Sequence, residues 1–274
     1  MNQTALLINE QQAAAAFDKQ AAIFDELYSR NTIIQYKRDR VRRHVQERIN
    51  PGTRILELNA GTGEDAIYFA RNGYHIHATD ISNNMLAKLE EKQRKAGLED
   101  FISLERCSYS ALDQLHEQGP FDMIFSNFAG INCCAQLESI LHQFGSVVKP
   151  GGLVTMVIMP PFCLWEVFLL FRGKFQTAFR RFFSQKGRMA HIEGAYFKCW
   201  YYRPKDVIRH LGKEFELESL EGLCSIVPPS YLEGFAEKHP KLYRILEKAE
   251  RKLKGNWPWK NIGDYFIISL RKCT

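Results

Sequence analysis

The sequence predicts an α/β protein built on a doubly wound, mostly parallel sheet. From residue 54 onwards, short apolar runs that suit buried strands alternate with amphipathic stretches that suit helices. Several of these runs are followed by a turn that contains glycine or by a residue that favours the start of a helix, as in βαβ units. At 274 residues the chain is long enough for one large domain and too short for two full-sized ones. We therefore expect one domain over residues 1–274.

The first 50 residues are predicted to be helical. Apolar side chains between Gln12 and Ile49 recur mostly at steps of three and four, which is typical of helices laid on a core. Pro51 and Gly52 end this pattern. We expect residues 1–50 to form a helical cap.

The remaining elements alternate until an insertion interrupts them. Strands are predicted at 54–58, 75–79, 101–106, 123–126 and 153–159. Helices are predicted from the glycine turn to about 71, from 82 to about 97 and over 135–148. After Pro160 and Pro161, residues 160–200 are expected to form an inserted helical lid. The chain then resumes with a helix at 204–211, a strand at 217–227, a helix at 231–254 and a strand at 265–270.

The overall composition indicates a globular protein and selects no partner. A net charge of +6 attracts anions in general, and an excess of this size is common among enzymes. The seven cysteines form no CxxC pair, so we expect neither a disulfide framework nor a metal site. Residues 1–20 lack a signal-peptide pattern, and the most apolar run, 160–171, is too short to span a bilayer. We expect a cytoplasmic protein.

A glycine turn after the first strand indicates a nucleotide-type site. Gly61 and Gly63 precede a helix, so the backbone can approach a ligand and the helix amides can face it. Asp80 ends the second strand 19 residues after Gly61, a spacing at which a carboxylate accepts hydrogen bonds from both ribose hydroxyls. Taken separately, the glycines could form a tight turn without a ligand, and Asp80 could be the N-cap of a helix. The occurrence of both features at this spacing favours a ligand site.

The segment 57–63, Glu-Leu-Asn-Ala-Gly-Thr-Gly, resembles the first motif of the class I S-adenosylmethionine-dependent methyltransferases, which reads acidic-x-Gly-x-Gly-x-Gly. The resemblance extends through 78–86, 121–127 and 148–152, and so covers roughly 52–159. It implies a Rossmann-like, seven-stranded sheet with an antiparallel last strand at 263–269. It also implies S-adenosyl-L-methionine as the cofactor and S-adenosyl-L-homocysteine as the product.

The same resemblance implies roles for individual residues. Gly61 and Gly63 would face the methionine part of the cofactor, Asp80 would hold the ribose, and Met85 would line the adenine side. Asn59 replaces the first glycine of the motif and tolerates a positive φ, so we expect the turn to be kept. Many relatives bind the adenine amine with an Asp after the third strand. Ser108 stands there in this chain, so a hydroxyl or backbone contact is expected instead. The predicted cofactor set is Glu57, Asn59, Gly61, Gly63, Asp80, Ile81, Met85, Ser108, Tyr109 and Asn127.

Methyl transfer from a sulfonium is an in-line displacement, which needs alignment of the acceptor and exclusion of water. Asn127 and Phe128, after the fourth strand, are expected beside the transferred methyl group, although Asn127 could equally be a satisfied loop amide. His191 in the insertion is the candidate base for an acceptor that needs one. A surface histidine on a lid is the simpler interpretation of His191.

The insertion is both aromatic and basic. This composition predicts either a lid that encloses an apolar or aromatic acceptor or a segment whose aromatic side chains pack on the core. Its basic side could receive a carboxylate, a phosphate, an acidic carrier protein or a membrane surface. The family's Asn-Pro-Pro-Tyr signature for amino groups of bases is absent at 126–129, so nucleic acid is not favoured. The predicted walls of the substrate pocket are Tyr28, Tyr36, Phe128, Trp165, Phe168, Tyr201 and Tyr202.

Three classes of function stay open. The first is a methyltransferase for a small apolar or aromatic acceptor, including an anionic or carrier-bound one. The second is an S-adenosylmethionine-binding protein that catalyses another reaction, such as a cyclisation, or regulates without turnover. The third is an NAD(P)-dependent oxidoreductase, whose looser fingerprint permits Ala66 in place of its last glycine. Glu57 and the Lys-Pro-Gly-Gly turn at 149–152 favour the methyltransferase.

Overall fold

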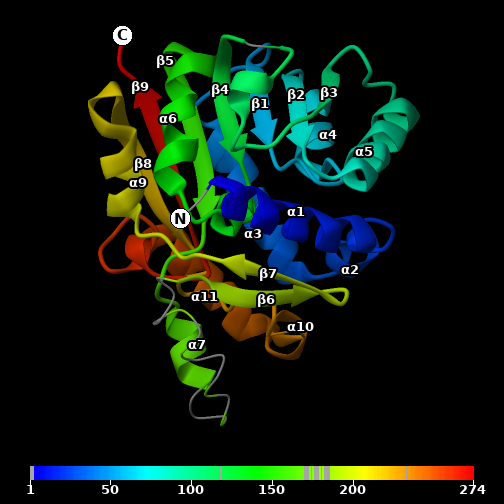
Figure 1. The fold of residues 1–274 in the computed structure, drawn as a ribbon. Coiled ribbons are helices and arrows are strands. Elements are labelled where there is room, and N and C mark those ends of the chain that lie inside the picture. The colour runs from blue at the N-terminus through cyan, green and yellow to red at the C-terminus, as the bar shows by residue number, and fades with distance from the viewer. Residues whose placement is uncertain are drawn as a thin grey trace.

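The computed structural model describes residues 3–117, 119–169, 173, 175, 179, 181, 186–232 and 234–274, with side chains from residue 8 onwards. Its centre is a seven-stranded sheet in the order β3-β2-β1-β4-β5-β9-β8 (Figure 1). The first five strands are parallel, and β9 runs antiparallel to both β5 and β8. The strands are β1 (Arg54–Leu58), β2 (His75–Asp80), β3 (Ile102–Arg106), β4 (Phe121–Ser126), β5 (Val148–Ile158), β8 (Phe215–Leu223) and β9 (Tyr265–Lys272).

Helices cover both faces of this sheet, because successive strand residues point to opposite sides. Ile55 of β1 packs in one cluster with α3 (Thr32–Gln46), α4 (Glu64–Arg71) and α5 (Asn83–Ala96). Its neighbour Leu56 packs in the other cluster, with α6 (Leu137–Val147) and α9 (Pro204–Leu211). The predicted doubly wound, seven-stranded fold is therefore confirmed.

The strand order reverses between β1 and β4, and a crevice opens where their carboxyl ends diverge. Two N-terminal helices, α1 (Gln3–Gln20) and α2 (Phe24–Ser29), lie over this edge of the sheet. In Figure 1, α1 lies between the strands and a separate hairpin formed by β6 (Arg188–Ile192) and β7 (Ala195–Cys199). It contacts β6, β7, α5 and the 3-10 turn η2 (Gly130–Cys133).

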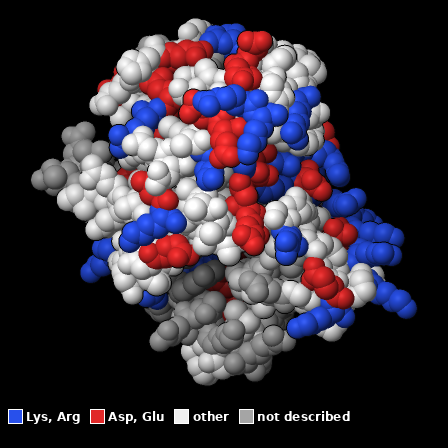
Figure 2. Space-filling view, turned by 90° about the vertical axis from the view of Figure 1, so that its right-hand side faces the viewer, with Lys and Arg blue, Asp and Glu red and all other residues white. Residues whose placement is uncertain are grey.

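Ion pairs attach α2 to the body of the protein. Acidic and basic side chains are interspersed over the face that carries α2 and α5 (Figure 2). On this side Lys92 Nζ of α5 lies 2.6 Å from Asp25 Oδ2 of α2 and 2.6 Å from Glu64 Oε1 of α4. The same carboxylate of α2 accepts a hydrogen bond from Thr62 Oγ1 of the glycine turn, at 2.6 Å. The cap is thus fastened to the turn that the sequence singles out.

The insertion differs from the wholly helical lid predicted. It contains the short α7 (Leu164–Phe168), and the hairpin β6–β7 follows at 188–199. Alternation in β6 explains the hairpin, since Met189 and His191 are exposed while Ala190 packs towards α1. Several residues of the predicted lid lie outside the described residues: Phe171, Arg172, Lys174, Arg180, Phe182 and Phe183.

The C-terminal region also departs from prediction in one respect. The single helix expected at 231–254 is divided into α10 (Phe235–Lys238) and α11 (Pro240–Leu253). Pro240 takes the first position of α11, where its missing N–H costs nothing, and it cannot continue the helix before it. Short 3-10 turns complete the chain at η1 (Leu112–Gln114), η4 (Gly212–Glu214) and η5 (Trp259–Asn261). Among the described helices, none has the length and apolar character needed to cross a bilayer.

Candidate active site

A cavity lies at the carboxyl edge of β1, β2 and β4, where the strand order reverses and ligands bind in sheets of this kind. The ends of β1 and β2, the segments that follow these strands and β3 and β4, and the start of α5 contribute Glu57, Asn59, Ala60, Gly61, Thr62, Asp80, Ile81, Met85, Tyr109, Asn127, Phe128 and Gly130. The helices contribute Glu10, Ala13, Ala14, Phe17, Phe24, Arg38, Glu64 and Asp65.

Asn59 keeps the left-handed turn that the motif's first glycine would make. Its φ is 49°, and its side chain joins two loops, because Nδ2 donates to Asn127 O at 2.8 Å and Oδ1 accepts from Ser126 Oγ at 2.6 Å. A Cβ added to Gly130 would lie 2.3 Å from Asn59 Cγ. The asparagine is therefore accommodated by a glycine elsewhere, on the loop after β4.

The two motif glycines have different surroundings. Gly61, with φ of 57°, lines the cavity, and a Cβ there would meet nothing within 4 Å. Gly63, with φ of 77°, is the N-cap of α4 and lies outside the lining. A Cβ on Gly63 would lie 2.0 Å from Leu89 Cδ1 of α5. This glycine therefore serves the close packing of α4 on α5, and its predicted contact with the cofactor stays a prediction.

Asp80 ties the glycine turn to the start of α5. Its Oδ2 accepts from the backbone N–H of Gly61 and its Oδ1 from that of Ser82, each at 2.9 Å. Burial raises the pKa of Asp80, and these backbone donors partly offset the rise. Each carboxylate oxygen keeps a further lone pair. The carboxylate is thus fixed in place and can still accept from ligand hydroxyls.

Glu57 carries a buried carboxyl group that the described residues leave incompletely satisfied. It is 3% exposed, and its Oε2 has no hydrogen-bond partner among them. Burial and the nearby carboxylate of Asp65 raise the pKa of Glu57 well above its ordinary value, against the effect of Arg42 and Arg38. A buried carboxylate without a donor is costly, so this oxygen calls for a cationic donor from a ligand.

Arg38 supplies the opposite charge in the same cavity. It is the one Lys or Arg among the described lining residues, and its Nη1 lies 3.6 Å from Asp65 Oδ2. A buried acid and a buried base thus line a common cavity. Their arrangement fits the zwitterionic end of an amino acid, with Glu57 facing an ammonium group and Arg38 a carboxylate.

Asn127 is a satisfied amide. Its Nδ2 donates to Asp65 Oδ2 at 2.7 Å, and its Oδ1 accepts from the backbone N–H of Phe128 at 2.8 Å. The side chain therefore fits the interpretation of Asn127 as a satisfied loop amide, and it shapes the loop after β4. The residue still lines the cavity.

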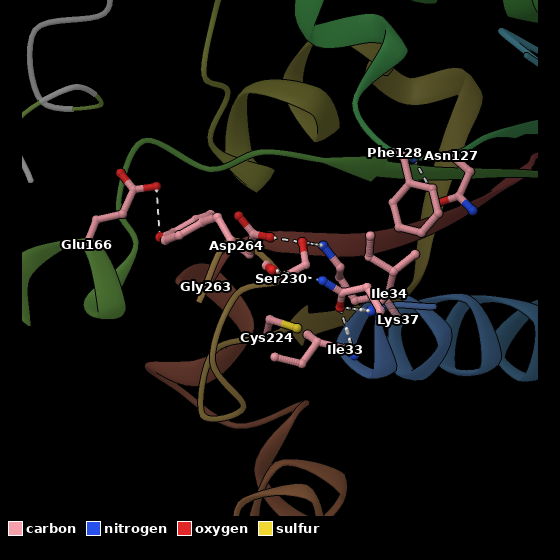
Figure 3. A network of polar contacts seen from close by, with 12 residues as sticks. Ile33, Ile34, Lys37, Asn127, Phe128, Glu166, Cys224, Ser230, Gly263 and Asp264 are labelled. Carbon is pink, nitrogen blue, oxygen red and sulfur yellow. Dashed lines mark hydrogen bonds and ion pairs between the residues drawn. The ribbon is translucent and has the colours of Figure 1, made fainter. Parts of the chain in front are cut away.

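Phe128 is held in a strained conformation beside the cavity. Its φ is 46° and that of Ala129 is 66°, each costing about 1–2 kcal/mol for a residue with a Cβ. The ring packs edge-on against Tyr265 at 5.9 Å, and Lys37 Nζ lies 5.6 Å from its centroid. Figure 3 shows the network that fixes Lys37, which donates to Ser230 Oγ at 2.9 Å and to Asp264 Oδ2 at 3.2 Å.

The same network anchors the insertion. Arg181 is 1% exposed and donates to Glu166 Oε1 at 2.9 Å and to Asp264 Oδ1 at 3.0 Å. It also donates to the carbonyls of Pro160 and Gly263. Arg181 therefore joins the first part of the insertion, at Pro160 and Glu166, to the start of β9, next to the residues that support Phe128.

Most of the predicted substrate walls lie outside the lining of this cavity, as do one catalytic candidate and, besides Gly63, one further cofactor candidate. His191 is exposed on β6, with its ring 4.5 Å from that of Tyr196. Tyr36 instead donates to Glu250 Oε1 at 3.0 Å within the core, and Tyr202 donates to the carbonyl of Cys134. Ser108 donates to Glu10 Oε1 at 2.5 Å and is not part of the lining.

The remaining aromatic candidates also have other neighbours. Trp165 and Phe168 line a separate groove, and Trp165 Nε1 donates to the carbonyl of Ile226 at 3.1 Å. Tyr28 packs on Phe24 of the same helix at 4.7 Å, and Tyr201 lies under the Arg181 guanidinium at 5.2 Å. Of the predicted walls, Phe128 alone is in the cavity lining among the described residues.

Sequence reasoning missed the residues that the cap contributes: Glu10, Phe17, Phe24, Arg38 and, on α4, Asp65. For Arg38 a signal was present, because it stands four residues after Ile34 and three before Val41, on the buried stripe of α3. A charged residue on an apolar stripe indicates a buried partner or a ligand. Nothing comparable marks Glu10. Among the described residues, no group of three or more metal-ligating side chains gathers in one place.

The fold and cavity define a Rossmann-like protein that binds a nucleotide-type cofactor at the switch point of its sheet. Residues 55–152 match the family model described as "Methyltransferase domain". The chain is similar to the demethylmenaquinone methyltransferase of Corynebacterium efficiens, at 28% identity over 155 residues, covering 53% of this chain and 63% of that protein. It is also similar to the tRNA 5-carboxymethoxyuridine methyltransferase of Escherichia coli, at 26% identity over 104 residues, covering 38% of this chain and 39% of that protein.

A solved structure shares the fold. An S-adenosylmethionine-dependent methyltransferase from Mesorhizobium loti superposes with a TM-score of 0.53 at 18% identity, over 85% of this chain and 96% of that one. Residues 55–152 are thus similar to the methyltransferase domain of the class I S-adenosylmethionine-dependent methyltransferases, and the seven-stranded sheet has the same fold. This similarity supports S-adenosylmethionine as the cofactor, in place of a nicotinamide dinucleotide. The chain spans less than two thirds of the length of the curated relatives described here.

Proposed function

We propose that this chain transfers the methyl group of S-adenosylmethionine to a small apolar or aromatic acceptor, as in biosynthetic metabolism. The observation that carries the proposal is the unpartnered Oε2 of Glu57, in a cavity that also holds Arg38 and Asp80. Glu57 would receive the ammonium group, Arg38 the carboxylate and Asp80 the ribose hydroxyls. When bound, the cofactor supplies a methyl group that is electrophilic because it is attached to a sulfonium.

The chain's own part is to orient the reactants and exclude water. α1 and α2 cover the carboxyl edge, and three phenylalanines, Phe17, Phe24 and Phe128, contribute apolar surface to the cavity. This lining supports an apolar or aromatic acceptor. The strained backbone at Phe128 and Ala129 lies where such an acceptor would meet the methyl group, and strain of this kind clusters at functional sites.

No histidine lines the cavity among the described residues. This supports an acceptor that needs no imidazole base and a reaction in which His191 takes no part. An acceptor carried by a protein or a membrane, or a nucleic acid such as the substrate of the tRNA-modifying relative, is a less direct fit to a cavity enclosed by two helices.

The test incubates the purified full chain with S-adenosylmethionine and a panel of phenols, quinols, amines, short fatty acids and tRNA, and measures S-adenosylhomocysteine by mass spectrometry. We expect acceptor-dependent product with an aromatic small molecule, its loss in Asp80→Ala, and a rate within about twofold of wild type in the matched control His191→Ala. Tight binding of S-adenosylhomocysteine without turnover on any acceptor would instead favour a regulatory module or another reaction. No binding at all would refute the cofactor site.

A further inference from the structure

Glu10 of α1 is a buried carboxylate without a cation. It is 5% exposed, and no ion pair joins it to a Lys, Arg or His within the described part of the chain. Its Oε1 accepts from Ser108 Oγ at 2.5 Å, and its Oε2 accepts from Ser110 Oγ. Burial raises the pKa of Glu10 in spite of these two hydroxyl donors. An ionised carboxylate has about four acceptor sites, so two hydroxyls leave it under-satisfied.

The position of Glu10 in the cavity shows what a third donor would be. Glu10 and Tyr109 line the cavity near the exit of β3, which pairs with β2 and follows Asp80 along the sheet edge. The backbone N–H of Cys107 donates to Asp80 O at 3.2 Å, which joins the two strand ends directly. Glu57 and Arg38 occupy the part of the cavity beside β1 and β4. A nucleoside held at Asp80 by its ribose, with its amino-acid end at Glu57, therefore directs its base towards Glu10.

We propose that Glu10, contributed by the N-terminal cap, accepts a hydrogen bond from the exocyclic amine of the cofactor's adenine. This inference rests on the proposed function. Ser108 occupies the position after β3 where an acidic residue would be expected, and its hydroxyl is already donated to Glu10. The carboxylate that contacts the base thus comes from α1, and the loop after β3 holds it in place through Ser108.

This arrangement makes Glu10 a specificity residue. An ionised carboxylate accepts hydrogen bonds and cannot donate them, so it favours a 6-amino purine and repels the carbonyl of a 6-oxo purine. The simpler role is that of a latch, in which Glu10 only holds α1 on the loop at 108–110. A latch affects every ligand alike, whereas an adenine contact changes the preference between the two bases.

The experiment uses calorimetry on the full chain with S-adenosylhomocysteine and its 6-oxo analogue, S-inosylhomocysteine. We expect wild type to prefer the amino form by at least about 10-fold, and Glu10→Gln to reduce that preference by about 10-fold or more, because an amide can donate to the 6-oxo group. Asp18→Asn is the matched control. Asp18 also fastens α1, through Ser82 Oγ and the backbone N–H of Asn84, but it does not line the cavity.

The outcomes separate the two proposals. Weaker binding of both ligands by Glu10→Gln with the wild-type preference unchanged would leave only the latch and overturn the inference. The same preference shift in Asp18→Asn would also overturn it, since loosening of α1 would then explain the effect. Failure of wild type to bind S-adenosylhomocysteine would refute the cofactor site itself. Thermal melting of each variant confirms that it is folded.

Discussion

The two glycines of the cofactor motif should respond very differently to the same substitution. At Gly61 an added methyl group meets nothing within 4 Å, so Gly61→Ala costs only the left-handed backbone, about 1–2 kcal/mol of unfolding free energy. At Gly63 the methyl group also collides with Leu89, with 2.0 Å to Cδ1 and 2.8 Å to Cγ. Overpacking of this kind adds about 1–3 kcal/mol, so we expect about 2–5 kcal/mol for Gly63→Ala.

A double-mutant cycle isolates the collision. Leu89→Ala alone removes a fully buried side chain from the core and should cost about 2–5 kcal/mol. In the double variant, which combines Gly63→Ala with Leu89→Ala, the new methyl group occupies the space left by the leucine side chain. The combined loss should therefore fall short of the sum of the single losses by about 1–3 kcal/mol, the part of the cost due to the clash.

Urea denaturation followed by circular dichroism measures these free energies. Losses at Gly63 and Leu89 that add to within about 0.5 kcal/mol would refute the packing explanation. So would equal losses for Gly61→Ala and Gly63→Ala. Binding provides a second comparison, because Gly61 lines the cavity and Gly63 does not. Gly61→Ala should weaken S-adenosylhomocysteine binding more than Gly63→Ala does in the folded protein.

Three further substitutions test the charges around the cavity. Asp80→Ala should weaken S-adenosylhomocysteine binding by about 1–3 kcal/mol through the loss of charge-assisted hydrogen bonds, and unchanged affinity by calorimetry would remove Asp80 from the site. Because the folded-state pKa of Glu57 is raised, the folded protein binds more protons there than the unfolded chain, and stability falls as pH rises through that window. Glu57→Gln should therefore stabilise the free protein at pH 8 by at least about 1 kcal/mol while weakening ligand binding, and a lower melting temperature than wild type at that pH would contradict this. Arg181→Met leaves Glu166 and Asp264 buried beside an apolar side chain and should cost about 3–5 kcal/mol in urea unfolding, whereas a loss below about 1 kcal/mol would show the network to be dispensable.

The fold was predictable because its signals are local. Each parallel strand is a short apolar run, and each following turn contains residues that suit a helix start, so residues 54–159 could be divided correctly to within a few positions. Gly61 and Asp80 could be placed in one site because the carboxyl ends of β1 and β2 meet at one edge of the sheet. The left-handed Asn59 was also correctly expected.

The rest of the cavity could not be predicted in the same way, because it depends on contacts between segments far apart in the sequence. Glu10 meets Ser108 across 98 residues, and Lys37 meets Asp264 across 227. The aromatic spacing of the insertion indicated a helix, but exposure alternates along β6, and Trp165 belongs to a second groove. Aromatic character alone does not reveal which cavity a side chain lines.

Three features of this site are unfavourable in the free protein: the unpartnered Oε2 of Glu57, the buried carboxylate of Glu10, and the left-handed backbone at Phe128 and Ala129. The first two would be relieved by donors that one ligand carries at opposite ends, an ammonium group and an aromatic amine. A ligand that supplies both would stabilise the folded chain by an amount that grows with its concentration over Kd. The strain at Phe128 differs, because no cofactor donor relieves it and the network of Lys37 and Asp264 maintains it. On the proposed function, the charges would therefore select the cofactor, while the phenylalanine loop, fixed independently of it, would position the acceptor.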